Sequence, residues 1–267
     1  MSLEKILKKI KNEFEVAIKT AKFNGNTYDN GNKAKEALIR SQKIINYIHD
    51  FVKEDFIIAG VAKNKIYPPI KHTNPELKIQ GFLKSKNQDI AIVPDKALIK
   101  KTSEYFSEVE RILSVNVRSQ LSSLAKNIDT LYERTFAESL NLHLSYPKQV
   151  LGEVYLIPTH EYDDKAMLKN KVVFKKISKI ENYIKMFQAI NERESADKDE
   201  YKYERVCLLV VDFRSKSPKL YSDVASLIKD GLVPPNTSLT FEKLSINNFS
   251  NDLLSIYNNR FGKGKLN

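Results

Sequence analysis

Apolar residues recur at three- and four-residue spacing over two stretches near the start of the chain. The first stretch predicts an amphipathic helix over 3–21, because its apolar positions would share one helix face: Leu3, Ile6, Leu7, Ile10, Phe14, Ile18 and Ala21. A Gly/Asn-rich loop over 24–32 separates it from a second predicted helix, whose expected face comprises Ala37, Leu38, Ser41, Ile44, Ile45, Ile48 and Val52. The chain is therefore expected to open with two helices.

The pattern changes to alternation after a proline-containing segment over 68–75, which interrupts any helix. Apolar and polar residues alternate over 77–82, which predicts a strand, and 84–87 has the composition of a turn. Two further strands are predicted over 89–93 and 112–117. Three strands are thus expected to follow the opening helices.

Helical and strand patterns share the second half of the chain. Helical periodicity covers 121–144, 177–190 and 249–261, while unbroken apolar runs over 150–157 and 205–213 are typical of buried strands. The predicted fold class is α/β, with a mixed sheet flanked by helices and an N-terminal helical segment. No linker is visible, so 1–267 is expected to form a single domain with N-terminal helices (1–55), a core (75–215) and a C-terminal helical part (216–267).

The net charge of the chain indicates what kind of partner it binds. The chain has 44 Lys and Arg against 33 Asp and Glu, a formal net charge of +11. Such a balance favours a polyanionic partner, and nucleic acid is the first candidate because cationic side chains release the counterions of phosphates. The alternative is that basicity serves only solubility. Charge by itself does not decide between them.

Several protein classes are disfavoured by what the sequence lacks. No apolar run approaches the length of a membrane span, and the amphipathic first helix does not resemble a signal peptide, so a soluble, cytoplasmic protein is expected. The single cysteine, Cys207, lies in an apolar run and is expected to be a buried thiol. Nucleotide-binding glycine motifs, a nucleophile elbow and zinc-ligand spacings are not recognisable.

Three polar residues on two predicted strands could form a reactive site. Asp89 opens one strand, while Asn116 and Arg118 lie on the next and project from the same face. An antiparallel register that sets Asp89 opposite Asn116 also sets Val93 opposite Ile112 and keeps both strands apolar toward the core. We expect the three polar side chains to form one exposed patch at a sheet edge. Metal-dependent phosphodiester hydrolysis uses such groups, since carboxylates hold Mg²⁺ and a cation stabilises charge on phosphorus.

These segments resemble the PD-(D/E)xK superfamily of type II restriction endonucleases. The matching stretches are Gln88-Asp-Ile-Ala-Ile-Val93 and Leu113-Ser-Val-Asn-Val-Arg-Ser-Gln120, and the Ser-Gln after the cation is similar to the subgroup that cuts CTCGAG. The resemblance spans about 75–215. It implies a restriction-endonuclease-like core in which an Asp-led strand precedes a strand bearing acid-x-Lys and then a helix.

Two departures from the family pattern concern the site itself. The second acid is Asn116 here and the lysine is Arg118. An amide oxygen brings no negative charge, and arginine stays protonated and cannot act as a general base. Cleavage would then need another carboxylate: we favour Glu133 or Glu76, with Glu138 also available, since some relatives recruit an acid from the helix.

The resemblance implies a Mg²⁺-dependent, sequence-specific endonuclease acting on double-stranded DNA. Asp89 and Asn116 would bind the metal, and Gln120, Lys126 and Asn127 would contact DNA. Palindromic targets call for a homodimer, and a cognate DNA methyltransferase is expected to be encoded nearby. By family analogy, lysine in place of Arg118 is expected to be tolerated.

Alternatives remain at the level of sequence. A catalytically decayed DNA-binding protein on the same fold would also carry Asn116 and Arg118, and a protein that does not bind nucleic acid is a third hypothesis. Asp95, which follows Pro94, is the rival of Asp89 as first acid. The cluster His160-Glu-Tyr-Asp-Asp164 has the residue types of a metal site, but it is expected to form an acidic surface loop.

Overall fold

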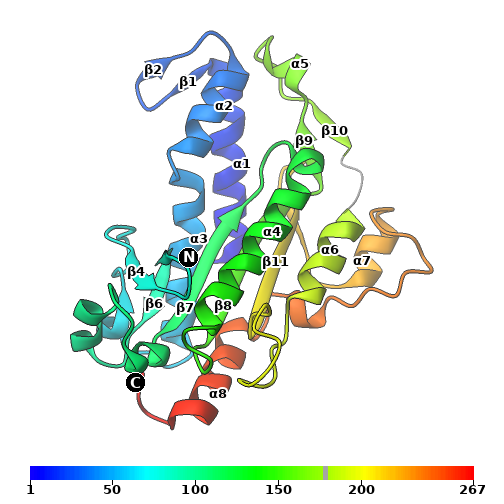
Figure 1. The fold of residues 1–267 in the computed structure, drawn as a ribbon. Coiled ribbons are helices and arrows are strands. Elements are labelled where there is room, and N and C mark those ends of the chain that lie inside the picture. The colour runs from blue at the N-terminus through cyan, green and yellow to red at the C-terminus, as the bar shows by residue number, and fades with distance from the viewer. Residues whose placement is uncertain (177–179) are drawn as a thin grey trace.

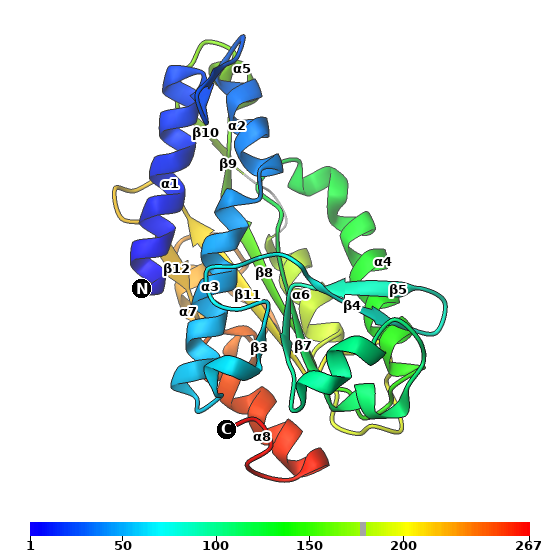
Figure 2. The same cartoon turned by 90° about the vertical axis from the view of Figure 1, so that its left-hand side faces the viewer.

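A six-stranded mixed sheet forms the centre of the computed structural model, with helices on both of its faces (Figure 1). The structure describes residues 1–176 and 180–267, without the side chains of residues 125, 126 and 176. The view turned by 90° shows α1 and α3 on one side of the sheet and α4 and α6 on the other (Figure 2). The α/β class and the mixed sheet covered on both faces are confirmed.

The strand order of the central sheet is β12-β11-β8-β7-β6-β3. The antiparallel strands β3, β6 and β7 form one half, β7, β8 and β11 run parallel, and β12 is antiparallel to β11. In chain order the strands are β3 (Ile66–Tyr67), β6 (Ile90–Ile92), β7 (Leu113–Ser119), β8 (Leu151–Pro158), β11 (Arg205–Asp212) and β12 (Lys219–Tyr221). Helix α4 (Leu124–His143) makes the crossover between β7 and β8 that a parallel pair requires.

The register of β6 and β7 follows the predicted one. Ile90 pairs with Val115 and Ile92 with Leu113, so that Asp89 lies beside Asn116. The alternation in the sequence fixes this register, because a slip of one residue would turn the apolar side chains of both strands to the wrong face.

Two hydrophobic cores lie on opposite faces of the sheet, and successive strand residues alternate between them. In β11, for example, Cys207 and Leu209 belong to the core under α1, α3 and α8, whereas Leu208 and Val210 belong to the core under α4 and α6. Cys207 is fully buried, as expected. Burial of β8 and β11 along their whole length explains their unbroken apolar runs.

The opening helices differ from expectation at one point. Helix α1 (Leu3–Thr20) forms as predicted, but the second predicted helix is two helices, α2 (Gly31–Arg40) and α3 (Lys43–Ile58). Gln42 takes a left-handed conformation with φ of 60° and separates them. Helical spacing continues across this break, which is why periodicity alone joined the two helices.

Short strands outside the central sheet account for two wrong predictions. Residues 84–87, predicted as a turn, mostly belong to β5 (Ser85–Gln88), which pairs with β4 (Leu77–Gln80). The predicted acidic surface loop begins with a buried strand, β9 (His160–Tyr162), which pairs with β10 (Phe174–Lys176). Both hairpins contain a strand of mainly polar residues, which lacks the apolar alternation that predicts a strand. A third small hairpin joins β1 (Lys22–Phe23) to β2 (Asn26–Thr27).

The remaining helices complete the two covering layers. The predicted helix over 249–261 is confirmed as α8, and the helix predicted over 177–190 is described from 180 onward, its first positions lying outside the described residues. The helices not yet given are α5 (Asp164–Met167), α6 (Ile180–Ala189), α7 (Val224–Lys229), α8 (Phe249–Phe261), and the 3-10 turns η1 (Lys63–Lys65), η2 (Lys96–Lys101), η3 (Ser107–Arg111) and η4 (Glu242–Leu244). None of the helices formed by the described residues has both the length and the apolar composition of a membrane span.

A buried charge cluster around Glu204 holds the C-terminal end of α4 against the sheet. One oxygen of Glu204 accepts hydrogen bonds from Arg193 at 3.4 Å and Arg260 at 2.8 Å. The other accepts the backbone N–H of Leu151 at 2.7 Å and lies 3.4 Å from Nε2 of His143, the last residue of α4. Glu204 thus ties the start of β8 to the end of the helix that precedes it.

Replacing Glu204 by Ala is expected to lower the free energy of unfolding by about 3 kcal/mol or more, because it leaves buried guanidinium groups without their carboxylate. Urea unfolding followed by circular dichroism measures the change. The exposed Glu194 provides the matched control, and Glu194→Ala should change stability by less than about 0.5 kcal/mol. Equal stabilities of the two variants would contradict the role given to Glu204.

Candidate functional site

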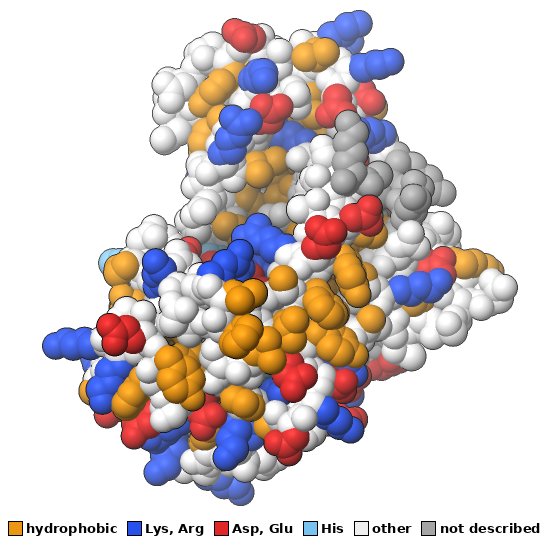
Figure 3. Space-filling view, in the orientation of Figure 1, with side chains coloured by type: hydrophobic (Ala, Val, Ile, Leu, Met, Phe, Trp, Pro, Cys, Tyr) orange, Lys and Arg blue, Asp and Glu red, His pale blue; other side chains and the backbone are white. Residues whose placement is uncertain are grey.

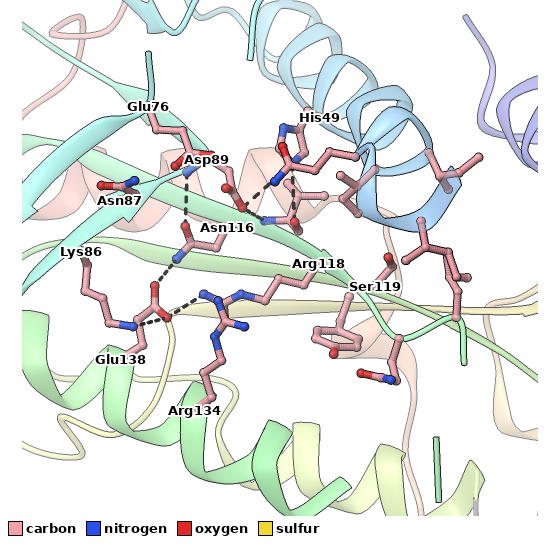
Figure 4. Close-up of a pocket in the computed structure, with 18 residues that line it drawn as sticks. His49, Glu76, Lys86, Asn87, Asp89, Asn116, Arg118, Ser119, Arg134 and Glu138 are labelled. Carbon is pink, nitrogen blue, oxygen red and sulfur yellow. Dashed lines mark hydrogen bonds and ion pairs between the residues drawn. The ribbon is translucent and has the colours of Figure 1, made fainter. Parts of the chain in front are cut away.

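A polar pocket of about 500 Å³ opens where β6 and β7 approach α3 and α4. Asp89 from the start of β6, Asn116 and Arg118 from β7, and Glu138 from α4 point toward one another at its centre (Figure 4). The three residues singled out from the sequence therefore lie together. The expectation that they form an exposed patch at a sheet edge is wrong, because β7 is an inner strand and helices on both sides enclose the pocket.

Asp89 is held by the backbone of the neighbouring strand. Its Oδ2 accepts the N–H of Val117 at 2.7 Å, and its own N–H donates to Oδ1 of Asn116 at 3.3 Å. Burial raises the pKa of the Asp89 carboxyl, although the Val117 N–H and the charge of Arg118 act in the opposite direction. This carboxylate makes no ion pair with a Lys or Arg among the described residues, unlike Glu138, which binds both Lys86 and Arg118.

Asn116 connects two acidic residues. Its Oδ1 accepts from the Asp89 backbone, and its Nδ2 donates to Oε1 of Glu138 at 3.0 Å. An aspartate at this position could not donate that hydrogen bond and would add a further negative charge. The amide is therefore suited to its surroundings.

Arg118 bridges two carboxylates from different elements. Its Nη2 donates to Oε2 of Glu138 at 2.6 Å, and its Nη1 donates to Oε1 of Glu153, on β8, at 3.1 Å. Burial of Arg118 disfavours its charge, but the charges of Glu153 and Glu138 outweigh this and raise its pKa. Arg118 thus stays a cation in the centre of the site.

Glu138 is the helix acid that reaches the pocket. It also accepts from Nζ of Lys86 at 2.9 Å. Burial alone would raise the pKa of Glu138, but Arg118 and Lys86 hold it below its ordinary value. Glu138 is therefore ionised and fully engaged.

Glu153 lies behind Arg118 and is fully buried. The parallel register of β7 and β8 sets it beside Asn116. Its Oε2 has no hydrogen-bond partner among the described residues, and burial raises the pKa of Glu153 to about 8. Sequence analysis gave no sign of this residue, since a lone Glu in an apolar strand does not reveal which neighbouring strand it faces.

A second residue that the sequence did not single out comes from α3. His49 lines the pocket, with Nε2 3.9 Å from Oδ2 of Asp89 and 3.4 Å from the carbonyl oxygen of Val117. Burial lowers the pKa of His49 to about 4, so the ring is neutral and adds no charge beside Asp89.

The other acids proposed from the sequence differ in their placement. Glu76 lines the pocket, whereas Glu133 is exposed on α4 and does not line it. Glu138 takes the expected place of Glu133. Helical periodicity carries a usable signal here: the buried positions Leu131, Thr135, Glu138 and Leu142 follow one another at spacings of four, three and four, which places Glu138 on the buried face.

The candidate DNA-contacting residues are also separated by the structure. Gln120 lines the pocket, Asn127 lies on α4 and is not among the described residues that line it, and the side chain of Lys126 lies outside the described part of the chain. Asp95, the rival first acid, accepts the backbone N–H of Ala97 at 2.8 Å as the N-cap of η2 and does not line the pocket. Of the two aspartates, Asp89 is the one in the pocket.

The oxygen donors of the pocket suit a hard divalent cation. Mg²⁺ binds to proteins through one or two carboxylates and completes its shell with water and substrate phosphate. Asp89 and Glu138 are two such carboxylates, and Asn116 bonds to the backbone N–H of the first and to the carboxylate of the second. Among the described residues, no group of three or more His, Cys, Asp or Glu side chains is arranged to hold a metal ion. A metal here would therefore have to be held by fewer than three such side chains of the described residues.

Comparison of the chain with protein-family models gave no match, and neither the curated proteins nor the solved structures gave one.

The raised pKa of Glu153 leads to a pH dependence of stability. Between pH 4.5, where the unfolded carboxyl loses its proton, and about 8, where the folded one does, stability falls as pH rises, by up to about 1.4 kcal/mol per unit. Glu153→Gln removes this contribution, so its stability relative to the wild type should rise through this window. Urea unfolding at pH 5, 6.5 and 8 measures the difference. Parallel profiles for the two proteins would refute the assignment, and Glu194→Gln should run parallel to the wild type.

Proposed function

We propose that this protein is a Mg²⁺-dependent endonuclease that cleaves double-stranded DNA at specific sequences, with the pocket around Asp89 as its active site. The observation that carries the proposal is the convergence of Asp89, Asn116, Arg118 and Glu138 from three elements within one pocket. Carboxylates for a metal and a fixed cation for phosphate charge are the two requirements of metal-dependent phosphodiester hydrolysis.

The topology supports a restriction-endonuclease-like core. Helix α3 is followed by the antiparallel strands β3, β6 and β7, then by the crossover helix α4 and the parallel strand β8. This order agrees with the resemblance, in which an Asp-led strand precedes the strand bearing the cation and a helix follows. The resemblance also allows an acid from that helix, and Glu138 is in position to be that acid.

Each residue has a part that follows from its chemistry. Asp89 and Glu138 would hold Mg²⁺, with the amide oxygen of Asn116 beside them, and the metal would supply an activated water and neutralise charge on phosphate. Arg118 stabilises negative charge on the phosphate and cannot take up a proton. His49 is a neutral imidazole next to Asp89.

Basic side chains around the pocket support a DNA partner. Lys86 and Arg134 line it, and Arg134 points from α4 into it (Figure 4). The space-filling view shows basic side chains where the surface is hollowed beside α4 (Figure 3). With a net charge of +11, these groups favour binding of a phosphate backbone. Cleavage of palindromic sites would require a two-fold homodimer, with a cognate methyltransferase protecting the host DNA.

A second function, DNA binding without cleavage, is favoured by one specific observation. Both oxygens of Glu138 already accept hydrogen bonds, from Asn116 on one side and from Lys86 and Arg118 on the other. A metal would have to compete with these donors. Cleavage assays separate the two functions.

Asp89→Asn is expected to reduce Mg²⁺-dependent cleavage of plasmid and phage DNA by at least about 1,000-fold, because it removes a proposed metal-binding carboxylate that makes no ion pair with Lys or Arg among the described residues. Gel electrophoresis after incubation with Mg²⁺ or EDTA measures this. Asp95→Asn, the matched control, should cleave at the wild-type rate. Wild-type gel retardation without cutting would support the second function, and neither retardation nor cutting would exclude both.

DNA affinity is expected to fall steeply with salt, with a slope of log K against log salt near one for each phosphate contact. Arg134→Ala should lower the magnitude of that slope by about one, because Arg134 lines the pocket and is free to meet a phosphate. Fluorescence anisotropy with a labelled duplex at several salt concentrations measures both slopes. Lys229→Ala on the distant helix α7 should leave the slope unchanged, and a flat response of the wild type would exclude a DNA role.

A further inference from the structure

The fully buried Glu153 is not explained by metal or DNA binding. It does not line the pocket, and its one hydrogen bond from a described residue is the bond from Arg118. A buried carboxyl group in the middle of a sheet is costly to desolvate, so its presence calls for a reason. The parallel register that sets Glu153 beside Asn116 suggests one.

Glu153 and Glu138 contact different ends of the same guanidinium. Nη1 of Arg118 donates to the carboxylate on β8, and Nη2 donates to the carboxylate on α4. A guanidinium is planar and presents its donors in a rigid fork, so two acceptors on two elements fix both its position and its plane. One carboxylate would leave the group free to turn about its side-chain bonds.

We propose that Glu153 is a positioning residue for Arg118, which it holds from β8 while Glu138 holds the same guanidinium from α4. The proposal rests on the function assigned to the pocket, since a fixed guanidinium matters for holding a phosphodiester. Oε1 of Glu153 can accept from Nη1 whether the group carries a proton or not, so the arrangement does not depend on titration.

Glu153 gives one explanation for both departures from the family pattern, Asn116 in place of an acid and Arg118 in place of a lysine. A neutral Asn116 suits this arrangement, because Glu153 already lies beside it and a fourth acid would add repulsion around Asp89 and Glu138. Arg118 is an arginine because a lysine ammonium is a point charge on a flexible stem and cannot bridge two separated carboxylates in a fixed plane. The contacts therefore lead us to expect that Arg118→Lys alone impairs the protein, contrary to the expectation from family analogy.

The direct test is the mobility of the Arg118 guanidinium, measured by ¹⁵N NMR of arginine side chains in the full-length protein. In the wild type we expect separate Nη signals, which indicate hindered rotation. Glu153→Leu, similar in volume but without an acceptor, should average them. Averaged signals in the wild type, or hindered rotation in the folded Glu153→Leu variant, would overturn the proposal. The wild-type spectrum decides even where a variant does not fold.

Cleavage kinetics test what the fixed guanidinium does. Glu153→Leu is expected to lower kcat about tenfold, as loss of a supporting partner commonly does, with KM changed less than about twofold. Glu153→Gln keeps an acceptor oxygen and should recover kcat to within about threefold of the wild type. Loss of the same size in both variants, or an effect on KM alone, would overturn the positioning role.

A double-variant comparison separates this proposal from the proposed function, because it needs no activity. Arg118→Lys should lower the urea midpoint, and Glu153→Leu should be less harmful in the Arg118→Lys background than in the wild type. Additive effects would overturn the bridge. If the wild type cleaves no DNA but the NMR and stability results hold, the proposed function fails while the positioning of Arg118 stands.

Discussion

The bridge from Glu138 through Arg118 to Glu153 is the interaction on which the rest of the site depends. Three carboxyl groups, those of Asp89, Glu138 and Glu153, lie in one largely buried region, where charges on them are poorly screened and Glu153 keeps its proton up to about pH 8. A permanent cation between two of them makes this arrangement possible. It also connects β7, β8 and α4, so the same contact that balances charge defines the shape of the pocket.

Helix α4 is held to the sheet at two levels, and each level involves a buried carboxylate. In its last third Glu138 meets Arg118, and at its end His143 approaches Glu204, which also binds the start of β8. The apolar face of α4, with Leu124, Leu131 and Leu142, packs in the core on the same face of the sheet. A helix anchored in this way cannot rotate without breaking one of the clusters, so the fold itself fixes the position of the helix acid relative to Asp89.

The spacing of apolar residues along the chain predicted the strands and the strand register that depend on neighbouring residues alone. Alternation set the register that brings Asp89 beside Asn116, and unbroken apolar runs identified β8 and β11, two of the three inner parallel strands. The hairpin strand β5 was missed because its residues are polar, and the break at Gln42 was missed because helical spacing continues across it.

The candidate site was predictable only in part, for a related reason. Asp89, Asn116 and Arg118 lie on neighbouring strands whose pairing their own sequence indicates. Glu153 reaches Arg118 through a parallel register that a long helical crossover creates, and no spacing in the sequence encodes that register. Glu138 was visible as one acid among several, and the choice between it and Glu133 depended on which face of α4 is buried.

Asp89, Glu138 and Glu153 differ in how accessible their carboxyl groups are to a cation that enters the pocket. Glu153 is enclosed behind Arg118, and Glu138 is shared among an amide, an ammonium and a guanidinium. Asp89 gives one oxygen to a backbone N–H, which leaves its charge uncompensated by any ion pair with Lys or Arg in the described part of the chain. An incoming cation would therefore meet Asp89 first and would gain Glu138 only by displacing Lys86 or loosening Arg118.

A phosphate arriving together with the cation would attract those same basic groups, so metal and phosphate would assist each other in opening the cluster. In the proposed endonuclease, such coupling would make the substrate itself a condition for assembling the metal site.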